Sequence, residues 1–307
     1  MEKFMLNILG CGSATPTARH KPSCQVLNFR ESLMMIDCGE GAQLAVRNLG
    51  LKFSRIDHIF ISHLHGDHCL GLPGLLSTMA LHDVGGTVKV YMHKEGIPIF
   101  SRLIDFVCKE RPYTLEFVPI PAEGGVLLDT HAISVEAFPL YHRVPTCGFI
   151  FREKPKARHV KGDMMKFYNV SVRDIPLIKQ GADLTLPDGR IIPNAHLTTD
   201  PTPSISYAYC SDTVFDPRVA EAVKNVDVIY HEATYMTREA GLAKERFHST
   251  AAQAAEIARM ADARQLIIGH YSMRYDNTDG LLAEARQVFP RSIAANEGMR
   301  IDLFKCV

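Results

Sequence analysis

The sequence has no excess of charge of either sign, because its 34 Lys and Arg residues balance 34 Asp and Glu residues. No global basic field therefore draws nucleic acid to the chain, although a local basic patch is compatible with this balance. No run of eighteen apolar residues occurs, so no helix is expected to span a membrane. The N-terminal apolar run is short and lacks a small-residue cleavage pattern, which is typical of a first β-strand rather than a signal peptide.

Cysteine pairs of the Cys-x-x-Cys type are also absent. The eight cysteines are scattered, and several lie in apolar, strand-like runs, as Cys38 and Cys210 do. This pattern predicts reduced, buried thiols without a disulfide partner, and it excludes a zinc-finger framework. Together with the start of the chain, it favours a cytoplasmic protein.

The chain does contain many short apolar runs with helical patterns between them, over 307 residues that can bury a sizeable core without crosslinks. We expect strands near residues 4–9, 24–29, 33–37, 56–61, 88–92, 133–139, 147–151, 205–210, 227–231, 266–269 and 299–304. We expect helices near residues 40–49, 69–82, 95–108, 216–225, 249–262 and 279–288. The pattern Thr250-x-x-Gln253 predicts a capping box on one of them. The mixture favours an α/β fold, a four-layer αββα sandwich, as a single domain over 1–307.

One segment, about residues 152–196, lacks this regular succession of apolar runs and helical patterns and is richer in charged residues, proline and glycine. Between residues 154 and 166 it has five basic residues and one acid, Asp163. A solvated surface insertion explains such a charge run, and so does a basic arm for a polyanion. The candidate contacts of such an arm are Lys154, Lys156, Arg158 and Lys161.

The most specific pattern is His-x-His-x-Asp-His at the end of an apolar run, formed by His63, His65, Asp67 and His68. Imidazole nitrogens and carboxylate oxygens are ligands that zinc prefers. The alternating His63 and His65 can face one ion, while Asp67 and His68, beyond the turn at Gly66, can face a second. The sequence therefore predicts a metal centre.

Further ligands are expected where other predicted strands end. His142, Asp212 and His270 each follow an apolar run, and α/β folds present functional groups at such positions. Each of the three could equally have an ordinary loop or packing role, but their shared placement favours them jointly. The loop Gly10–Thr17 is rich in small and hydroxyl residues and could line the cleft, although it lacks the spacing of a nucleotide-binding glycine motif.

In this order, these ligand-type residues resemble those of the metallo-β-lactamase superfamily, and the whole chain resembles the ribonuclease Z family, whose members trim the 3′ end of precursor tRNA. The resemblance extends to segments 10–17, 36–41, 211–213, 231–234 (His-Glu-Ala-Thr), 247–250 (Phe-His-Ser-Thr), 270–275 (His-Tyr-Ser-Met-Arg-Tyr) and 297–303. These segments cover nearly the whole chain outside residues 152–196. His-x-His-x-Asp-His alone specifies the superfamily, whereas the later motifs are more specific to the tRNA-processing family.

The resemblance implies roles for individual residues. One zinc ion would be held by His63, His65 and His142, a second by Asp67, His68 and His270, and Asp212 would bridge the two. Asp67 would also accept the proton of the attacking water. His248 would protonate the leaving 3′ oxygen, with Glu232 orienting it. Arg274, which follows His270, could contact a substrate phosphate, or it could equally hold a metal ligand in place. The products would be a tRNA with a 3′ hydroxyl and a trailer with a 5′ phosphate.

The resemblance also gives segment 152–196 a role, as the family's flexible tRNA-binding arm inserted into the domain. The end of the segment, Leu186–Arg190, matches the arm, but residues 168–181 lack the Gly-Pro pair of many bacterial members. In the family, the arm of one subunit reaches the tRNA held by the other, which implies a homodimer.

Two other functions remain as alternatives. A hydrolase of a small phosphodiester, thioester or lactone could keep every ligand on the same scaffold, but it has no use for a basic arm. A zinc protein that binds RNA without cutting it is disfavoured, because all seven ligand positions are filled by ligand-type residues.

Overall fold

The computed structural model describes residues 3–306 of the chain, which divide into two compact units. Within this range, the larger unit comprises residues 3–129, Ser134–Phe151 and 205–306, and the smaller unit comprises Thr130–Ile133 and Arg152–Ser204. Among the described residues, no helix combines the length and the apolar character that crossing a bilayer would require.

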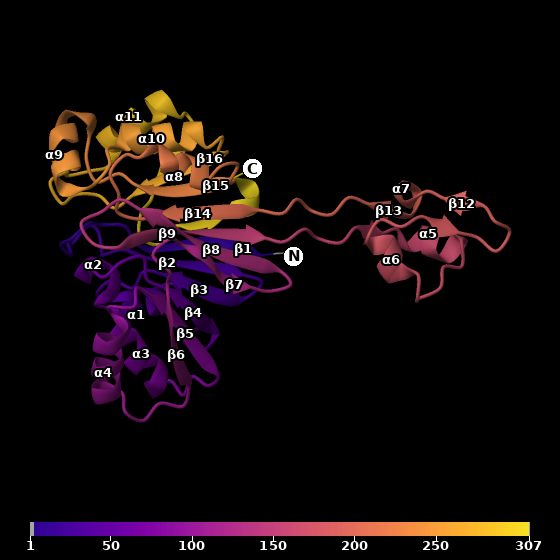
Figure 1. The fold of residues 1–307 in the computed structure, drawn as a ribbon, viewed down its shortest axis with the longest axis horizontal. Helices are drawn as coiled ribbons and strands as arrows, with labels where there is room; N and C mark the ends of the chain where they lie inside the picture. Colours follow the sequence, from indigo (N-terminus) through magenta and orange to yellow (C-terminus); the bar gives the residue numbers. More distant parts are fainter. Residues whose placement is uncertain (1–2, 307) are drawn as a thin grey trace. The chain divides into compact units, whose positions relative to one another are not determined.

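The first sheet of the larger unit has seven strands in the order β18-β1-β2-β3-β4-β5-β6 (Figure 1). The strands are β1 (Phe4–Gly10), β2 (Cys24–Phe29), β3 (Ser32–Ile36), β4 (Ile56–Phe60), β5 (Thr87–Met92), β6 (Thr114–Pro119) and β18 (Arg300–Asp302). Neighbours from β18 to β3 are antiparallel, and neighbours from β3 to β6 are parallel. Every residue of β2 is buried, as expected for a strand covered on both faces.

Helices on one side of this sheet bury their apolar faces against it (Figure 1). Val46, Leu76 and Ile104 come from three different helices and join Val90 of β5 in one apolar core. The helices of this half are α1 (Ala42–Asn48), α2 (Gly66–Cys69), α3 (Leu72–Leu81) and α4 (Ile97–Val107), with a short 3-10 turn η1 (Phe53–Arg55).

The second sheet also has seven strands, in the order β17-β16-β15-β14-β9-β8-β7. The strands are β7 (Gly125–Asp129), β8 (Ile133–Leu140), β9 (Thr146–Glu153), β14 (Ser206–Cys210), β15 (Val228–Glu232), β16 (Gln265–Gly269) and β17 (Ser292–Ala294). The associated helices are α8 (Pro217–Ala222), α9 (Ala240–Arg246), α10 (Ala251–Met260) and α11 (Asp279–Val288), with 3-10 turns η2 (Thr237–Glu239) and η3 (Leu303–Lys305). Helix α10 contacts β15 and β16, and it begins with the predicted capping box between Thr250 and Gln253.

The two sheets face each other across a shared interior. The ring of Phe60 in β4 lies 5.5 Å from the rings of both Phe149 and Phe151 in β9, measured between centroids. With helices on the outer face of each sheet, the larger unit is a helix–sheet–sheet–helix sandwich (Figure 1). The predicted four-layer αββα architecture is therefore confirmed.

The smaller unit extends to Ser204, eight residues beyond the expected end of the inserted segment. Its elements are short: β10 (His159–Val160), α5 (Gly162–Phe167), α6 (Ile175–Lys179), β11 (Leu184–Thr185), β12 (Ile191–Ile192), α7 (Asn194–Leu197) and β13 (Thr198–Thr199). Ile178, Leu184 and Leu197 form its own small apolar cluster. The unit holds nine Lys or Arg side chains and six Asp or Glu side chains, so it is net basic within a neutral chain.

Candidate metal centre

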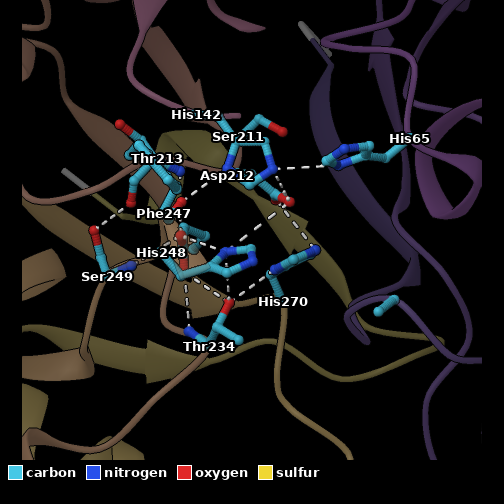
Figure 2. A network of polar contacts seen from close by, with 12 residues as sticks. His65, His142, Ser211, Asp212, Thr213, Thr234, Phe247, His248, Ser249 and His270 are labelled. Atoms are coloured by element: carbon cyan, nitrogen blue, oxygen red, sulfur yellow. Dashed lines mark hydrogen bonds and ion pairs between the residues drawn. The ribbon is translucent and has the colours of Figure 1, made fainter. Parts of the chain in front are cut away.

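The first group of ligand-type side chains comes from three segments that converge where strands of both sheets end. His63 follows β4, His65 precedes α2, and His142 follows β8. The Nδ1 atom of His65 lies 3.1 Å from His63 Nε2 and 3.2 Å from His142 Nε2. Asp212, just after β14, places its Oδ2 atom 3.6 Å from His63 Nε2 and 3.7 Å from His142 Nε2 (Figure 2).

A second group lies beside the first and shares Asp212 with it. His68 Nε2 and His270 Nε2 are 3.3 Å apart, and the Oδ2 atom of Asp67 is 3.5 Å from each. The other oxygen of Asp212, Oδ1, lies 3.1 Å from His270 Nε2 and 3.5 Å from His68 Nε2. One carboxylate therefore presents one oxygen to each group, and the structure brings all seven predicted ligand residues together.

Hydrogen bonds fix the orientation of the imidazole rings. His68 Nδ1 donates to Asp37 Oδ2 (2.7 Å), and His142 Nδ1 donates to the carbonyl of Phe247 (2.8 Å). His270 Nδ1 donates to Thr234 Oγ1 (2.9 Å), whose own proton goes to a carboxylate. Because Nδ1 is the donor in these three rings, their Nε2 atoms turn their lone pairs toward the centre, as metal-binding histidines do, whereas His65 faces the centre with Nδ1.

The donor set fits divalent metal ions. Burial lowers the pKa of His63, His65 and His142, which favours the neutral imidazole that a metal requires. Burial also lowers the pKa of His68, but the carboxylates of Asp212, Asp67 and Asp37 outweigh it and raise that pKa well above its usual value. The Oδ1 atom of Asp212 is buried without a hydrogen-bond partner in the described chain. Converging lone pairs, surplus negative charge and an unpartnered buried oxygen all indicate a cation at this place.

A buried acid–base pair adjoins the centre. Glu232, the last residue of β15, is 0% exposed, and its Oε1 atom accepts a hydrogen bond from His248 Nδ1 at 2.9 Å. Oε1 also accepts from the backbone of Thr213 and Ser249, and Oε2 accepts from Thr234. The carboxylate thus ties three loops of the site together, and it leaves His248 Nε2 free of any hydrogen bond to the described residues.

The two partners shift each other's pKa in opposite directions. Burial lowers the pKa of His248, but the charge of Glu232 and the hydrogen bond to it outweigh burial and raise the pKa to about 9. Burial raises the pKa of Glu232, but His248 outweighs it in turn and lowers that pKa to about 2. The pair is therefore an imidazolium and a carboxylate at neutral pH.

The centre opens into a cleft of about 190 Å³. Ser13 and Ala14 line it, and the backbone N–H of Ala14 donates to Asp67 Oδ2 at 2.6 Å, so the loop Gly10–Thr17 does line the cleft. Two exposed arginines that the sequence did not single out, Arg143 and Arg246, also line it.

The other predicted substrate contacts lie elsewhere. Arg274 is exposed, with its guanidinium 5.1 Å from the centre of the Tyr235 ring, and it is not among the residues that line the cleft. The basic residues of the smaller unit have contacts within it. Lys156 pairs with Glu153 at 2.9 Å, Arg158 pairs with Asp200, and Lys161 donates to the carbonyl of Ala195. Lys154 also lies in this unit, where its backbone N–H donates to the carbonyl of Ala132.

Asp37 is a site residue that sequence reasoning quoted in a motif but gave no role. It is fully buried and directly follows β3, and its carboxylate accepts hydrogen bonds from Ser62, His68 and Tyr209. The signal available in the sequence was an acidic residue directly after an apolar run, Met34-Met35-Ile36. The left-handed backbone of Asp37, with φ 54°, is seen only in the structure.

Known proteins share this fold and much of this sequence. A sequence model of the family described as Anti-Pycsar protein Apyc1 matches residues 4–103. The chain is similar to the ribonuclease Z of Porphyromonas gingivalis, with 52% identity over 305 residues that cover 99% of this chain and 100% of the relative. It is also similar in structure to human tRNase Z, short form, with a TM-score of 0.71, 24% identity and coverage of 97% and 99% of the two chains. A metallo-beta-lactamase fold protein, YhfI from Bacillus subtilis, has a TM-score of 0.70 at 16% identity, with coverage of 98% and 99%.

The sandwich and its two adjoining donor groups place the chain in the class of metallo-β-lactamase fold proteins. Half of the sequence is identical to that of a curated relative along essentially the full length of both chains. The chain belongs to the ribonuclease Z family.

Proposed function

We propose that this chain is a metal-dependent endoribonuclease that cuts precursor tRNA on the 3′ side of the discriminator nucleotide. The products are a tRNA with a 3′ hydroxyl and a trailer with a 5′ phosphate. The observation that carries the proposal is the position of Asp212, whose two oxygens face two complete groups of ligand-type side chains. Full-length relatives of the ribonuclease Z family favour this activity over the hydrolysis of a small substrate.

The proposed cofactor is a pair of zinc ions. His63, His65 and His142 would hold one ion, Asp67, His68 and His270 the other, and Asp212 both. A set of five imidazoles and two carboxylates suits zinc, which prefers nitrogen and oxygen ligands of these kinds. When bound, two such ions neutralise the charge of a phosphodiester and make water a stronger nucleophile.

Asp67 is proposed to accept a proton from the attacking water. Burial raises the pKa of Asp67, but His68 and His270 outweigh it and hold that pKa well below its usual range. The carboxylate is therefore ionised at neutral pH, and its hydrogen bond from the Ala14 N–H keeps it oriented at the wall of the cleft.

His248 is proposed to donate the proton that the leaving oxygen needs. Attack on phosphorus breaks the bond to the 3′ oxygen of the discriminator nucleotide, which departs as a hydroxyl once it is protonated. His248 lines the cleft, its Nδ1 is occupied by Glu232, and its raised pKa keeps Nε2 protonated at neutral pH. Glu232 is thus a positioning residue for the acid.

The smaller unit is proposed to be the tRNA-binding arm, and the enzyme a cytoplasmic homodimer in which each arm serves the partner's site. Support comes from the unit's net basic composition and from its insertion in the chain between strands β9 and β14 of the sandwich. Lys154, Lys156, Arg158 and Lys161 are the proposed phosphate contacts. Lys156 and Arg158 would have to exchange their partners Glu153 and Asp200 for a phosphate. Arg274 is proposed as a contact outside the cleft.

The test is cleavage of an end-labelled precursor tRNA by zinc-loaded protein, with a chelator-treated sample beside it. We expect a single metal-dependent cut directly after the discriminator nucleotide. If the precursor stays intact while a small phosphodiester is hydrolysed, the small-substrate hydrolase replaces the proposed function.

A further inference from the structure

A second, larger pocket adjoins the cleft of the metal centre. Its volume is about 700 Å³, which lies within the range of small-molecule sites. Phe215, Gly241, Lys244 and Phe247 line it, and so does His248. His248 lines the metal cleft as well, so the proposed proton donor stands where the two hollows meet.

The lining of this pocket suits a flat aromatic group that carries polar edges. Phe215 is partly exposed and Phe247 is 39% exposed, so both present apolar ring surface to solvent. Lys244 makes no ion pair with any residue in the described range 3–306, and it adds one cation to the wall. Gln253 uses its Oε1 atom to cap helix α10, and its amide nitrogen has no partner in the same range. Nucleobases combine a π-face with such hydrogen-bonding edges, and they stack on aromatic side chains.

The position of His248 decides which base enters. On the proposed function, His248 protonates the 3′ oxygen that leaves, and this oxygen belongs to the nucleotide on the 5′ side of the cut. The ribose of that nucleotide must therefore lie against His248, at the mouth of the larger pocket. We propose that the pocket lined by Phe215, Gly241 and Phe247 binds the base of the discriminator nucleotide.

Gly241 offers a way to fill the pocket without disturbing its wall. A Cβ atom at this position would meet nothing within 4 Å, and the backbone there has no positive φ. Gly241→Leu therefore adds volume from the first turn of α9, and leucine is a better helix former than glycine. Gly85→Leu is the matched control, because Gly85 is equally unobstructed and lies in the loop before β5.

The experiment combines these variants with two precursor tRNAs, one of them abasic at the discriminator position, and measures kcat/KM for each combination. The wild-type enzyme should lose roughly tenfold or more on the abasic precursor, the contribution of one base–aromatic stack. Gly241→Leu should lose a similar factor on the intact precursor and little more on the abasic one. Phe215→Ala should show the same non-additivity, and Gly85→Leu should behave as wild type.

Two results would overturn the assignment. If Gly241→Leu and removal of the base each lower kcat/KM and the two factors multiply when combined, the discriminator base binds elsewhere. A third precursor, abasic at the first trailer nucleotide, tests the other side of the cut. If Gly241→Leu is non-additive with this change instead, the pocket binds the first trailer base. A zinc-loaded wild-type enzyme that cuts neither precursor contradicts the proposed function itself, an outcome distinct from both.

Discussion

Asp37 holds His68 through a hydrogen bond of 2.7 Å between Asp37 Oδ2 and His68 Nδ1, at a depth where neither side chain is exposed. The same carboxylate accepts from the N–H and the hydroxyl of Ser62 and from the hydroxyl of Tyr209. These donors come from both sheets, since Ser62 follows β4 and Tyr209 lies in β14. One buried carboxylate therefore joins the two halves of the sandwich and orients a proposed metal ligand.

We predict that Asp37→Asn weakens metal binding. Asparagine keeps the shape of the side chain but replaces one acceptor by an amide N–H group, which cannot accept the proton of His68 Nδ1. Loss of such a partner typically lowers metal affinity roughly 10- to 100-fold. Competition with a chromogenic chelator measures the effect, and Asp57→Asn is the control, since Asp57 pairs with Ser32. Affinity equal to that of the wild type in a folded Asp37→Asn protein would refute the orienting role.

Asp67→Ala should abolish cleavage and leave the fold intact. The side chain touches the Ala14 N–H, His68 and His270, so its loss removes both a proposed ligand and the proposed proton acceptor. We expect a loss of roughly 10⁴-fold in kcat, or more, on precursor tRNA. Far-ultraviolet circular dichroism and metal analysis accompany the assay, with the exposed Asp105→Ala as control. Retained turnover would remove Asp67 from the mechanism.

The metal ligands could be predicted from the sequence because four of them lie within six residues and the others each follow a strongly apolar strand. Asp37 could not be given its role in this way. Its partners, Ser62, His68 and Tyr209, meet it only through strand pairing and a left-handed turn. Arg143 and Arg246 are similar cases, since exposed arginines in loops carry no local signal of the cleft that they line.

The fold shows the same division between strong and weak local signals. All eleven predicted strands and all six predicted helices exist, with ends that differ by a few residues. The prediction missed β6 and β7, neither of which has a single fully buried residue. In β6 (Thr-Leu-Glu-Phe-Val-Pro) polar and apolar residues alternate over only four positions, and in β7 (Gly-Val-Leu-Leu-Asp) they do not alternate. It also missed α9, a short helix with Gly241 in its first turn, and β17, which has three residues.

His248→Ala should lower kcat on precursor tRNA by roughly 10²–10⁴-fold, the usual contribution of a general acid. Glu232→Gln should cost less, and it should also shift the pH profile. Glu232 raises the pKa of His248 to about 9, so the wild-type acid loses its proton only in alkaline solution. Without the negative charge the proton is lost at lower pH, and the alkaline fall in kcat moves downward. The exposed Glu221→Gln is the control. If the alkaline fall in kcat of Glu232→Gln occurs at the same pH as in the wild type, Glu232 has only a structural role.

Shortening the smaller unit should raise KM for tRNA and spare a small phosphodiester. Deleting about residues 155–190 tests this directly. A milder version replaces residues 162–196 by a Gly-Ser turn, which keeps the β10–β13 pairing and the hydrogen bond from Lys161 to Leu197. The longer deletion removes seven basic and four acidic side chains, whereas the milder one removes four of each. We therefore expect KM to rise roughly tenfold or more and its salt dependence to weaken in the longer deletion, with a smaller change in the milder one. Equal losses on precursor tRNA and on bis(p-nitrophenyl) phosphate would show that the unit supports the fold instead.

Glu297 should stabilise the fold in a pH-dependent way. Its Oε1 atom accepts from the backbone of Cys11 and Lys21, and its Oε2 atom accepts from His20 Nδ1 at 3.0 Å, so it anchors both ends of the loop that carries Ala14. Burial raises the pKa of Glu297, but the hydrogen bonds from His20 and from backbone N–H groups together outweigh it, and the pKa lies below its usual value.

Because the folded-state pKa is depressed, this stabilisation is present above the ordinary glutamate pKa of about 4.3 and is lost as the pH falls below it. Glu297→Gln should therefore lower the free energy of unfolding by about 1–3 kcal/mol at pH 7, and the difference from wild type should shrink toward pH 3. Urea unfolding of metal-free proteins measures this, with Glu256→Gln, which removes an exposed pair with Arg259, as the control. A difference that stays constant from pH 7 to pH 3 would mean that the ionised form of Glu297 is not what anchors the loop.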